Sequence, residues 1–263
     1  MKAVNIHTLN GYKARGEKFP VITAYDSAFA RQVELAEIDV ALVGDSLGNV
    51  VLGYKSTVPV SMSDMVHHTA AVARGNSKSL VVADLPFMSY STENDTLSNS
   101  ARLMQAGAHM VKLEGGAWLT ESIYKLAQRG IPVCGHLGLT PQSVNKLGGY
   151  KVQGRDDAAA QEILQDALSL QEAGADLLVL ECVPTDLGAR ITKELAIPVI
   201  GIGAGPETDA QVLVIYDMLG FSPRIPKFTR NFLAETNSIE KALANYAAAV
   251  RSGEFPAPEH CFD

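Results

Sequence analysis

The sequence predicts an α/β fold, namely a single (β/α)8 barrel that takes up residues 1–263. Three observations predict it. The chain has 263 residues, close to the roughly 250 that one such barrel needs. Short runs rich in Val, Ile and Leu recur without strict polar alternation, as is typical of strands buried on both faces. Segments with helical patterning separate most of these runs, which indicates βαβ units and a parallel sheet.

The expected strands and helices follow from these patterns and from the residues at their ends. The strands are expected at residues 19–24, 40–43, 80–83, 110–113, 131–134, 177–180, 199–202 and 212–215. The helices are expected at residues 27–36, 63–74, 94–106, 120–128, 157–173, 185–195 and 239–251. Ser61, Ser63 and Thr120 are candidate N-caps. The C-terminal tail, residues 255–263, is expected on the surface.

Composition and charge exclude several classes of function. The formal net charge is -7 and 47% of the residues are hydrophobic, so the chain has a sizeable core and repels phosphate backbones. We therefore expect no nucleic-acid partner and no membrane partner, and a cytoplasmic location. No apolar run reaches the roughly 18 residues that a membrane span requires. The three cysteines match neither a disulfide framework nor a zinc site, so reduced thiols are expected.

Acidic residues follow four of the expected strands. Asp45, Asp84, Glu114 and Glu181 each lie where an apolar run ends, and His136 follows the fifth run. Active sites of these barrels form at the C-terminal ends of the strands, so these side chains are expected to share one rim. Each acid alone is as easily a helix N-cap or a loop residue, but four such endings together favour a site.

A divalent metal would compensate these clustered charges. Carboxylates that lie together raise each other's pKa unless a cation neutralises them. Mg²⁺ prefers oxygen ligands and keeps open positions for a substrate. Asp45, Asp84 and Glu114 come from three consecutive strands, and we predict that they hold Mg²⁺.

A lysine on the same rim has two possible partners. Lys112 and Glu114 are two residues apart on a strand, so they point to the same side. An inward lysine needs an anion. That anion is either Asp84, in a purely structural pair, or the carboxylate of a substrate. Ser46 adds a hydroxyl group next to Asp45.

A small 2-oxo acid fits this set of groups. Its carbonyl and carboxylate oxygens can chelate the metal together, which makes the proton on the adjacent carbon removable. The base must lie off the metal, and Glu181 is the best candidate. His136 is either an alternative base, a hydrogen-bond donor or an ordinary loop histidine. A glycine-rich segment at residues 148–155 is a candidate flap over the site.

At these strand ends the chain resembles the ketopantoate hydroxymethyltransferase family. The matching segments are residues 22–26, 43–48, 84–87, 112–116, 135–142, 148–155, 180–184, 201–205 and 226–228. The resemblance fades over the first ~18 residues, at residues 222–224 and in the C-terminal tail, and none of these carries the expected chemistry. It also implies a barrel of the phosphoenolpyruvate/pyruvate-binding type.

The resemblance implies a reaction and a role for each site residue. The family transfers a hydroxymethyl group from 5,10-methylenetetrahydrofolate to 3-methyl-2-oxobutanoate, giving 2-dehydropantoate and tetrahydrofolate on the route to pantothenate and coenzyme A. The resemblance implies that Asp45, Asp84 and Glu114 hold one Mg²⁺ and that Glu181 is the proton acceptor. It implies that the 2-oxo acid contacts Asp45, Ser46, Asp84, Lys112 and His136. It also implies a cytoplasmic homo-oligomer, commonly a decamer.

Two other functions remain to be weighed. A lyase of the isocitrate lyase or phosphoenolpyruvate mutase kind would share the metal and the oxo-acid site, but the segment after the fifth strand differs from the signature typical of those enzymes. A non-catalytic binding subunit would have lost at least one rim acid, and none is missing. Spacing and composition alone do not identify a folate site.

Overall fold

The computed structural model describes residues 2–263, and its strands close into a parallel barrel in the order β1-β2-β3-β4-β5-β6-β7-β8. The strands are β1 Phe19–Thr23, β2 Val40–Val43, β3 Leu80–Asp84, β4 Met110–Glu114, β5 Val133–Gly138, β6 Leu177–Glu181, β7 Val199–Ile202 and β8 Ala210–Leu213. Each strand pairs in parallel with its neighbours, and β1 pairs with β8. The predicted (β/α)8 barrel is confirmed.

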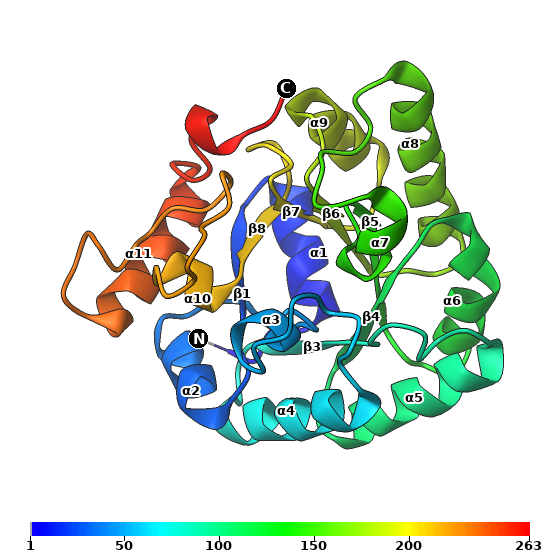
Figure 1. Cartoon of the computed structure of the whole chain (residues 1–263), viewed down its shortest axis with the longest axis horizontal. Coiled ribbons are helices and arrows are strands. Elements are labelled where there is room, and N and C mark those ends of the chain that lie inside the picture. The colour runs from blue at the N-terminus through cyan, green and yellow to red at the C-terminus, as the bar shows by residue number, and fades with distance from the viewer. Residues whose placement is uncertain (1) are drawn as a thin grey trace.

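Helices surround this ring of strands (Figure 1). They are α1 Ile6–Arg15, α2 Ser27–Leu35, α3 Leu47–Val50, α4 Met62–Gly75, α5 Glu93–Gln105, α6 Thr120–Ala127, α7 Val144–Leu147, α8 Asp157–Glu172, α9 Thr185–Glu194, α10 Ile215–Met218 and α11 Ile239–Ser252. All seven helices expected from the sequence are present, within one residue of the predicted ends. No helix among residues 2–263 is both long and apolar enough to cross a membrane.

Alternation along each strand divides the core into two parts. Along β1, Val21 packs in the cluster inside the barrel, whereas Ile22 packs in the cluster between strands and helices. Strand β4 behaves the same way, because Met110 faces inward and Val111 faces outward. Side chains two residues apart share a face, so Lys112 and Glu114 point into the barrel with Met110.

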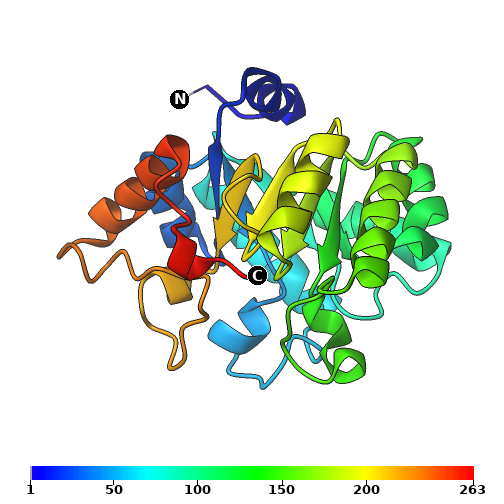
Figure 2. The same cartoon turned by 90° about the horizontal axis from the view of Figure 1, so that it is seen from above.

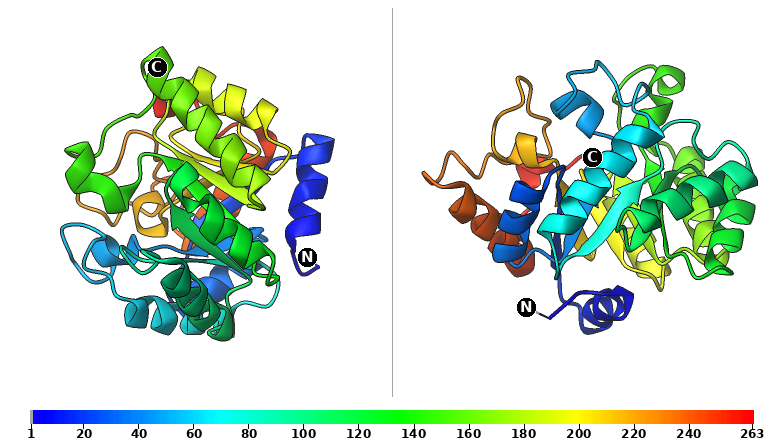
Figure 3. Two further views of the ribbon diagram at one scale, coloured as in Figure 1. Left: turned by 90° about the vertical axis from the view of Figure 1, so that its right-hand side faces the viewer. Right: turned by 90° about the horizontal axis from the view of Figure 1, so that it is seen from below.

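Helix α1 covers one end of the barrel. In Figure 2 this dark-blue helix crosses the end of the barrel opposite α3 and α7, and the two views of Figure 3 agree. Its Leu9 is fully buried with the inner cluster, and Tyr12 stacks on Phe19 with ring centroids 5.8 Å apart. Helix α1 thus closes one end of the barrel. The accessible opening is at the other end, where the carboxyl ends of the strands lie.

Some local predictions were wrong. Strand β5 begins at Val133 and runs to Gly138, so His136 lies within it, whereas the sequence placed the strand at residues 131–134. Gly135 does not end the strand: it lies within β5, where the lack of a side chain lets Leu170 pack closely against the strand. Strand β8 also begins two residues earlier than expected.

The N-cap predictions had mixed outcomes, and the tail prediction was wrong in part. Ser61 caps α4 in a capping box, whereas Ser63 lies inside α4 and Thr120 is the first residue of α6 after a 3-10 turn. In the C-terminal tail, Phe255 is 2% exposed and packs edge to face on Tyr246. Its ring also packs on Phe232, so this part of the tail belongs to the core.

Tyr246 of α11 joins the first and last strands. Its hydroxyl lies 2.8 Å from the carbonyl oxygens of Val21 in β1 and Gln211 in β8. The side chain is completely buried. A hydroxyl that donates at this seam supports the pairing that closes the barrel.

Candidate active site

The open mouth of the barrel holds one large cavity, of about 1180 Å³. Every site residue predicted from the sequence lines it: Asp45, Ser46, Asp84, Lys112, Glu114, His136 and Glu181. They come from the carboxyl ends of five strands, β2 to β6. Parallel pairing sets Asp84 beside Lys112 and Glu114 beside His136, so the register itself assembles the site.

Lys112 lies at the bottom of this cavity among acids. Its Nζ is 3.1 Å from Asp84 Oδ1 and 3.9 Å from Glu114 Oε1, and the side chain is 4% exposed. Burial alone would lower the pKa of Lys112, but attraction from Asp84, Glu114 and Asp45 raises it above its ordinary value. The lysine is therefore a fixed cation. It forms an ion pair with Asp84, which is one of the two partners expected for it from the sequence.

Asp45 and Asp84 carry more negative charge than Lys112 offsets. Burial, and then repulsion from Glu114 and Asp84, raises the pKa of Asp45 well above its ordinary value. Burial also raises the pKa of Asp84, although Lys112 opposes the change. The backbone N–H of Asp45 donates to Asp84 Oδ2 at 3.0 Å. Such acids favour a further cation nearby.

His136 links the bottom of the cavity to its edge. Its Nδ1 lies 3.2 Å from Glu114 Oε1 and its Nε2 lies 3.3 Å from Glu181 Oε2. Burial and Lys112 would lower the pKa of His136, but Glu114 and Glu181 raise it to about 9. Glu181 is the more exposed end of this row, with 14% of its side chain accessible.

Gln142 and Tyr90 complete the site, and the sequence did not identify them. Gln142 donates through its side chain to Asp45 Oδ2 at 2.8 Å and through its backbone N–H to Glu114 Oε2 at 3.0 Å. Tyr90 donates to Gln142 Oε1 at 2.5 Å. Both side chains are buried. Gln142 belongs to the segment 135–142, which carries part of the family resemblance. It was still not predicted as a site residue, because an uncharged amide does not by itself indicate a metal or catalytic site.

Ser46 stands on the other side of Asp45. Its hydroxyl lies 2.9 Å from the hydroxyl of Tyr25, which burial keeps protonated by raising its pKa. Tyr25 is another residue that the sequence did not assign to the site. The pair offers hydroxyl groups next to the acids.

The donor set fits a divalent metal in chemistry. Asp45, Asp84 and Glu114 present hard oxygen donors, as Mg²⁺ requires, and all three are buried around the cation Lys112. Within residues 2–263, no three acidic, histidine or cysteine side chains are already arranged to hold a metal ion. Gln142 donates to Asp45 Oδ2, and His136 Nδ1 lies next to Glu114 Oε1.

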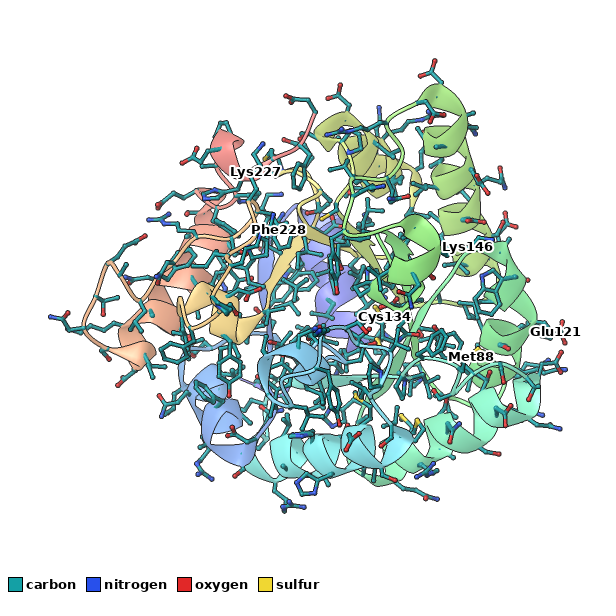
Figure 4. The ribbon with its side chains drawn as sticks, viewed as in Figure 1. Met88, Glu121, Cys134, Lys146, Lys227 and Phe228 are labelled. Atoms are coloured by element: carbon teal, nitrogen blue, oxygen red, sulfur yellow. The ribbon has the colours of Figure 1, made fainter. Side chains whose placement is uncertain are left out.

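The predicted flap borders the same cavity. Tyr150, Lys151 and Val152 line it, and the backbone N–H of Gln153 donates to the carbonyl of Cys182 at 2.9 Å. Cys182, the residue after Glu181, has a positive φ of 47°. The segment 148–155 is thus joined by a backbone hydrogen bond to the residue that follows the candidate base Glu181. Cys134 and Cys182 are buried free thiols; Cys134 belongs to the cluster inside the barrel, and Figure 4 labels it close to β4.

Comparison with known proteins agrees with this geometry. The family model for ketopantoate hydroxymethyltransferase matches residues 3–258. A 3-methyl-2-oxobutanoate hydroxymethyltransferase of Saccharophagus degradans is 59% identical over 99% of this chain and 97% of its own length. One from Marinobacter nauticus is 59% identical over 99% of both chains.

Solved structures with the same fold are more distant. Two structures of phosphonopyruvate hydrolase, one in complex with oxalate and Mg²⁺, are each 14% identical with TM-scores of 0.63 and 0.61. They cover 83% and 80% of this chain, and 84% and 80% of their own chains. Likeness at this identity concerns the fold alone, so it gives no support to a mutase or lyase activity. The full-length matches decide the family: the chain belongs to the ketopantoate hydroxymethyltransferases.

Proposed function

We propose that this hydroxymethyltransferase moves a one-carbon unit from 5,10-methylenetetrahydrofolate to C3 of 3-methyl-2-oxobutanoate and releases 2-dehydropantoate and tetrahydrofolate. The observation that carries the proposal is the row His136–Glu181 at the edge of a cavity whose bottom holds Lys112 among three carboxylates. Glu181 at the edge can act as a base toward an acidic C–H group, and Lys112 at the bottom can bind a carboxylate. A small 2-oxo acid carries these two groups at its two ends.

Binding of the oxo acid is assigned to the bottom of the cavity. Lys112 supplies the positive charge for the substrate carboxylate, and Ser46 supplies a hydroxyl group next to Asp45. Burial of these groups strengthens each electrostatic contact. The substrate is thereby held with C3 toward Glu181, as proton transfer requires.

Proton transfer begins at Glu181, which accepts the C3 proton. The electron pair left on C3 forms the new carbon–carbon bond with the methylene carbon of the donor. Both carbon–nitrogen bonds of that methylene break, and water supplies the oxygen of the new hydroxymethyl group. The C3 proton and one proton of water end on the two donor nitrogens. His136 Nε2 lies 3.3 Å from Glu181 Oε2, close enough to orient that carboxylate by charge.

Asp45, Asp84 and Glu114 would hold one Mg²⁺. When bound, the metal would polarise the carbonyl of the oxo acid and so acidify C3. The burial of these three carboxylates around a single lysine supports this assignment. The complex of a phosphonopyruvate hydrolase with oxalate and Mg²⁺ provides a precedent in the same fold.

We also propose a cytoplasmic homo-oligomer, commonly a decamer in the family. Free cysteines are typical of a reducing compartment. Met88 and Trp118 are 61% and 66% exposed on the loops after β3 and β4, and large apolar side chains of this kind favour burial between subunits. Figure 4 places Met88 away from the central strands. Sedimentation equilibrium of the purified chain tests the assembly.

The test of the reaction is hydrogen–deuterium exchange at C3 of 3-methyl-2-oxobutanoate in D₂O, with and without Mg²⁺ and before folate is added. Metal-dependent exchange, followed by ketopantoate formation once methylenetetrahydrofolate is added, is the expected result. Absence of ketopantoate from the complete mixture would contradict the proposal. Cleavage of isocitrate or methylisocitrate would support a lyase instead.

A further inference from the structure

The cavity is much larger than the oxo acid needs. Its volume is about 1180 Å³, whereas pockets for whole drug-sized ligands span roughly 300–1,000 Å³. The groups assigned to the five-carbon acid all come from β2 to β6. The rest of the lining includes α3 and the loop after it, the segment 150–152, and a further wall built by α10, the segment that follows it and the C-terminal tail.

This second wall contains a buried carboxylate that the proposed chemistry does not use. Asp217 of α10 is 9% exposed and lines the cavity. Ser222 donates to its Oδ1, and no lysine or arginine among residues 2–263 forms an ion pair with it. Burial raises the pKa of Asp217. A buried carboxylate with no cation needs hydrogen-bond donors from elsewhere.

Aromatic rings lie on both sides of Asp217 in the chain. Tyr216 and Phe221 also line the cavity, with ring centroids 6.1 Å apart and planes inclined by 50°. Phe221 is 53% exposed. Rings beside a carboxylate that faces a cavity form a site for a flat heterocycle with N–H donors on one edge.

We propose that Asp217 binds the pterin ring of the folate donor, with its carboxylate accepting the N–H groups of the 2-amino and N3 positions, and that Tyr216 and Phe221, which contact each other, pack against one side of the ring. The assignment rests on the proposed function, which requires such a donor in this cavity. A 2-amino-4-oxo pterin presents these two donors side by side, and one carboxylate can accept both.

The location agrees with transfer to the oxo acid. Tyr25, whose hydroxyl lies 2.9 Å from Ser46 Oγ, stacks on Tyr216 with ring centroids 5.9 Å apart. The side chain of Tyr25 therefore lies between Tyr216, on the proposed pterin side of the cavity, and Ser46, on the side assigned to the oxo acid. A methylene group carried on the ring would lie between the two walls, where C3 must meet it.

Charge around the mouth agrees with the rest of a folate molecule. Although the chain has a net charge of -7, four cations besides Lys112 line the cavity, namely Lys55, Lys151, Arg224 and Lys227. Lys227 and Phe228 lie on the segment after α10 (Figure 4). Cations gathered in a cleft attract an anionic ligand, and the glutamate tail of folate carries the carboxylates.

The experiment compares wild type with Asp217→Asn, which keeps the shape and replaces one accepting oxygen by a donor. The expected result is a rise in KM for methylenetetrahydrofolate, and in Kd for tetrahydrofolate, of about 10- to 100-fold, as for loss of a charge-assisted hydrogen bond. KM for the oxo acid should stay close to that of wild type. Asp186→Asn is the matched control, because Asp186 is exposed on α9 and lies outside the cavity lining.

A ligand change makes the test independent of the variant's folding. Wild type should bind 2-desamino-2-methyl-tetrahydrofolate more weakly than tetrahydrofolate, and Asp217→Asn should lose most of that difference. Equal binding of the two ligands by wild type, or an unchanged KM in Asp217→Asn, would overturn the subsite. If wild type makes no ketopantoate, the proposed function fails, and calorimetric binding of tetrahydrofolate still decides the subsite.

Discussion

Gln142 donates a hydrogen bond from its side-chain amide to Asp45 Oδ2 at 2.8 Å, while its backbone N–H donates to Glu114 Oε2. One residue from the segment after β5 thus joins acids that follow β2 and end β4. Tyr90 fixes the amide by donating to its oxygen. These contacts orient two of the three proposed metal ligands before any metal binds.

Replacing Gln142 is therefore expected to weaken the metal site. Gln142→Ala removes the donor to Asp45, and groups that orient metal ligands typically contribute about 10- to 100-fold to metal affinity. Calorimetric titration of the metal-free protein with Mg²⁺ measures the loss without relying on turnover. Gln128→Ala is the control, since Gln128 donates to Tyr124 on the surface. Unchanged Mg²⁺ affinity in Gln142→Ala would show that the ligands orient themselves.

Glu181→Gln should separate binding from proton transfer. The amide keeps the shape of the side chain but cannot accept the C3 proton, so deuterium exchange and ketopantoate formation should each fall by about 10²- to 10⁴-fold. Affinities for Mg²⁺ and for 3-methyl-2-oxobutanoate should stay near those of wild type. If the Glu181→Gln variant loses oxo-acid binding while its metal affinity is normal, Glu181 is a binding residue and the base lies elsewhere.

Lys112→Ala distinguishes the two partners of the lysine. If Lys112 binds the substrate carboxylate, affinity for the oxo acid should fall about tenfold or more, as for loss of a charge-assisted contact, and affinity for Mg²⁺ should change less. Equal losses would favour a purely structural ion pair with Asp84. Since removing one charge of a buried pair is destabilising, thermal unfolding of each variant with saturating Mg²⁺ is the necessary control.

Asp39 should give a pH dependence of stability at the closed end of the barrel. Burial raises the pKa of Asp39, although Arg251 and Tyr12 oppose the rise. A raised folded pKa means that the contribution to stability is fully present below the ordinary value of 3.8 and is lost as the pH rises through the folded pKa. Relative to Asp39→Asn, wild type should therefore lose stability over that interval.

Chemical unfolding of wild type and Asp39→Asn at a series of pH values measures this difference. The amide introduced by Asp39→Asn retains an oxygen that can accept from Tyr12, so the Tyr12 hydrogen bond at 3.1 Å need not be lost. A difference that has the opposite sign, with wild type gaining stability as the pH rises, would mean that the ion pair with Arg251 outweighs burial.

The strands and their end residues were predictable because burial on both faces leaves a strong compositional pattern. Runs such as residues 177–180 contain only Val and Leu, and the acids that follow four of the runs mark the barrel mouth. The expectation of one domain over residues 1–263 and the role of each site residue stay predictions. The convergence of these side chains on one cavity follows from the register, which the sequence does not display.

Other features had no local signal. Helix α1 has only one fully buried side chain, Leu9, so its apolar stripe is too weak to predict a helix. Gln142 and Asp217 are polar residues whose importance arises from what other segments bring next to them. Phe262 lies in a tail that looked superficial, yet it contributes to the cavity wall because the chain returns across the mouth of the barrel.

The hydroxyl of Tyr246 at the β1–β8 seam affects how the chain can fold on the ribosome. The first strand is made early, but its partner β8 comes last among the strands, and Tyr246 lies 225 residues after Val21. Until α11 has left the exit tunnel, β1 retains an open edge that can pair with other nascent chains. Closure, and with it every ligand site that depends on the ring, is therefore an event at the very end of translation.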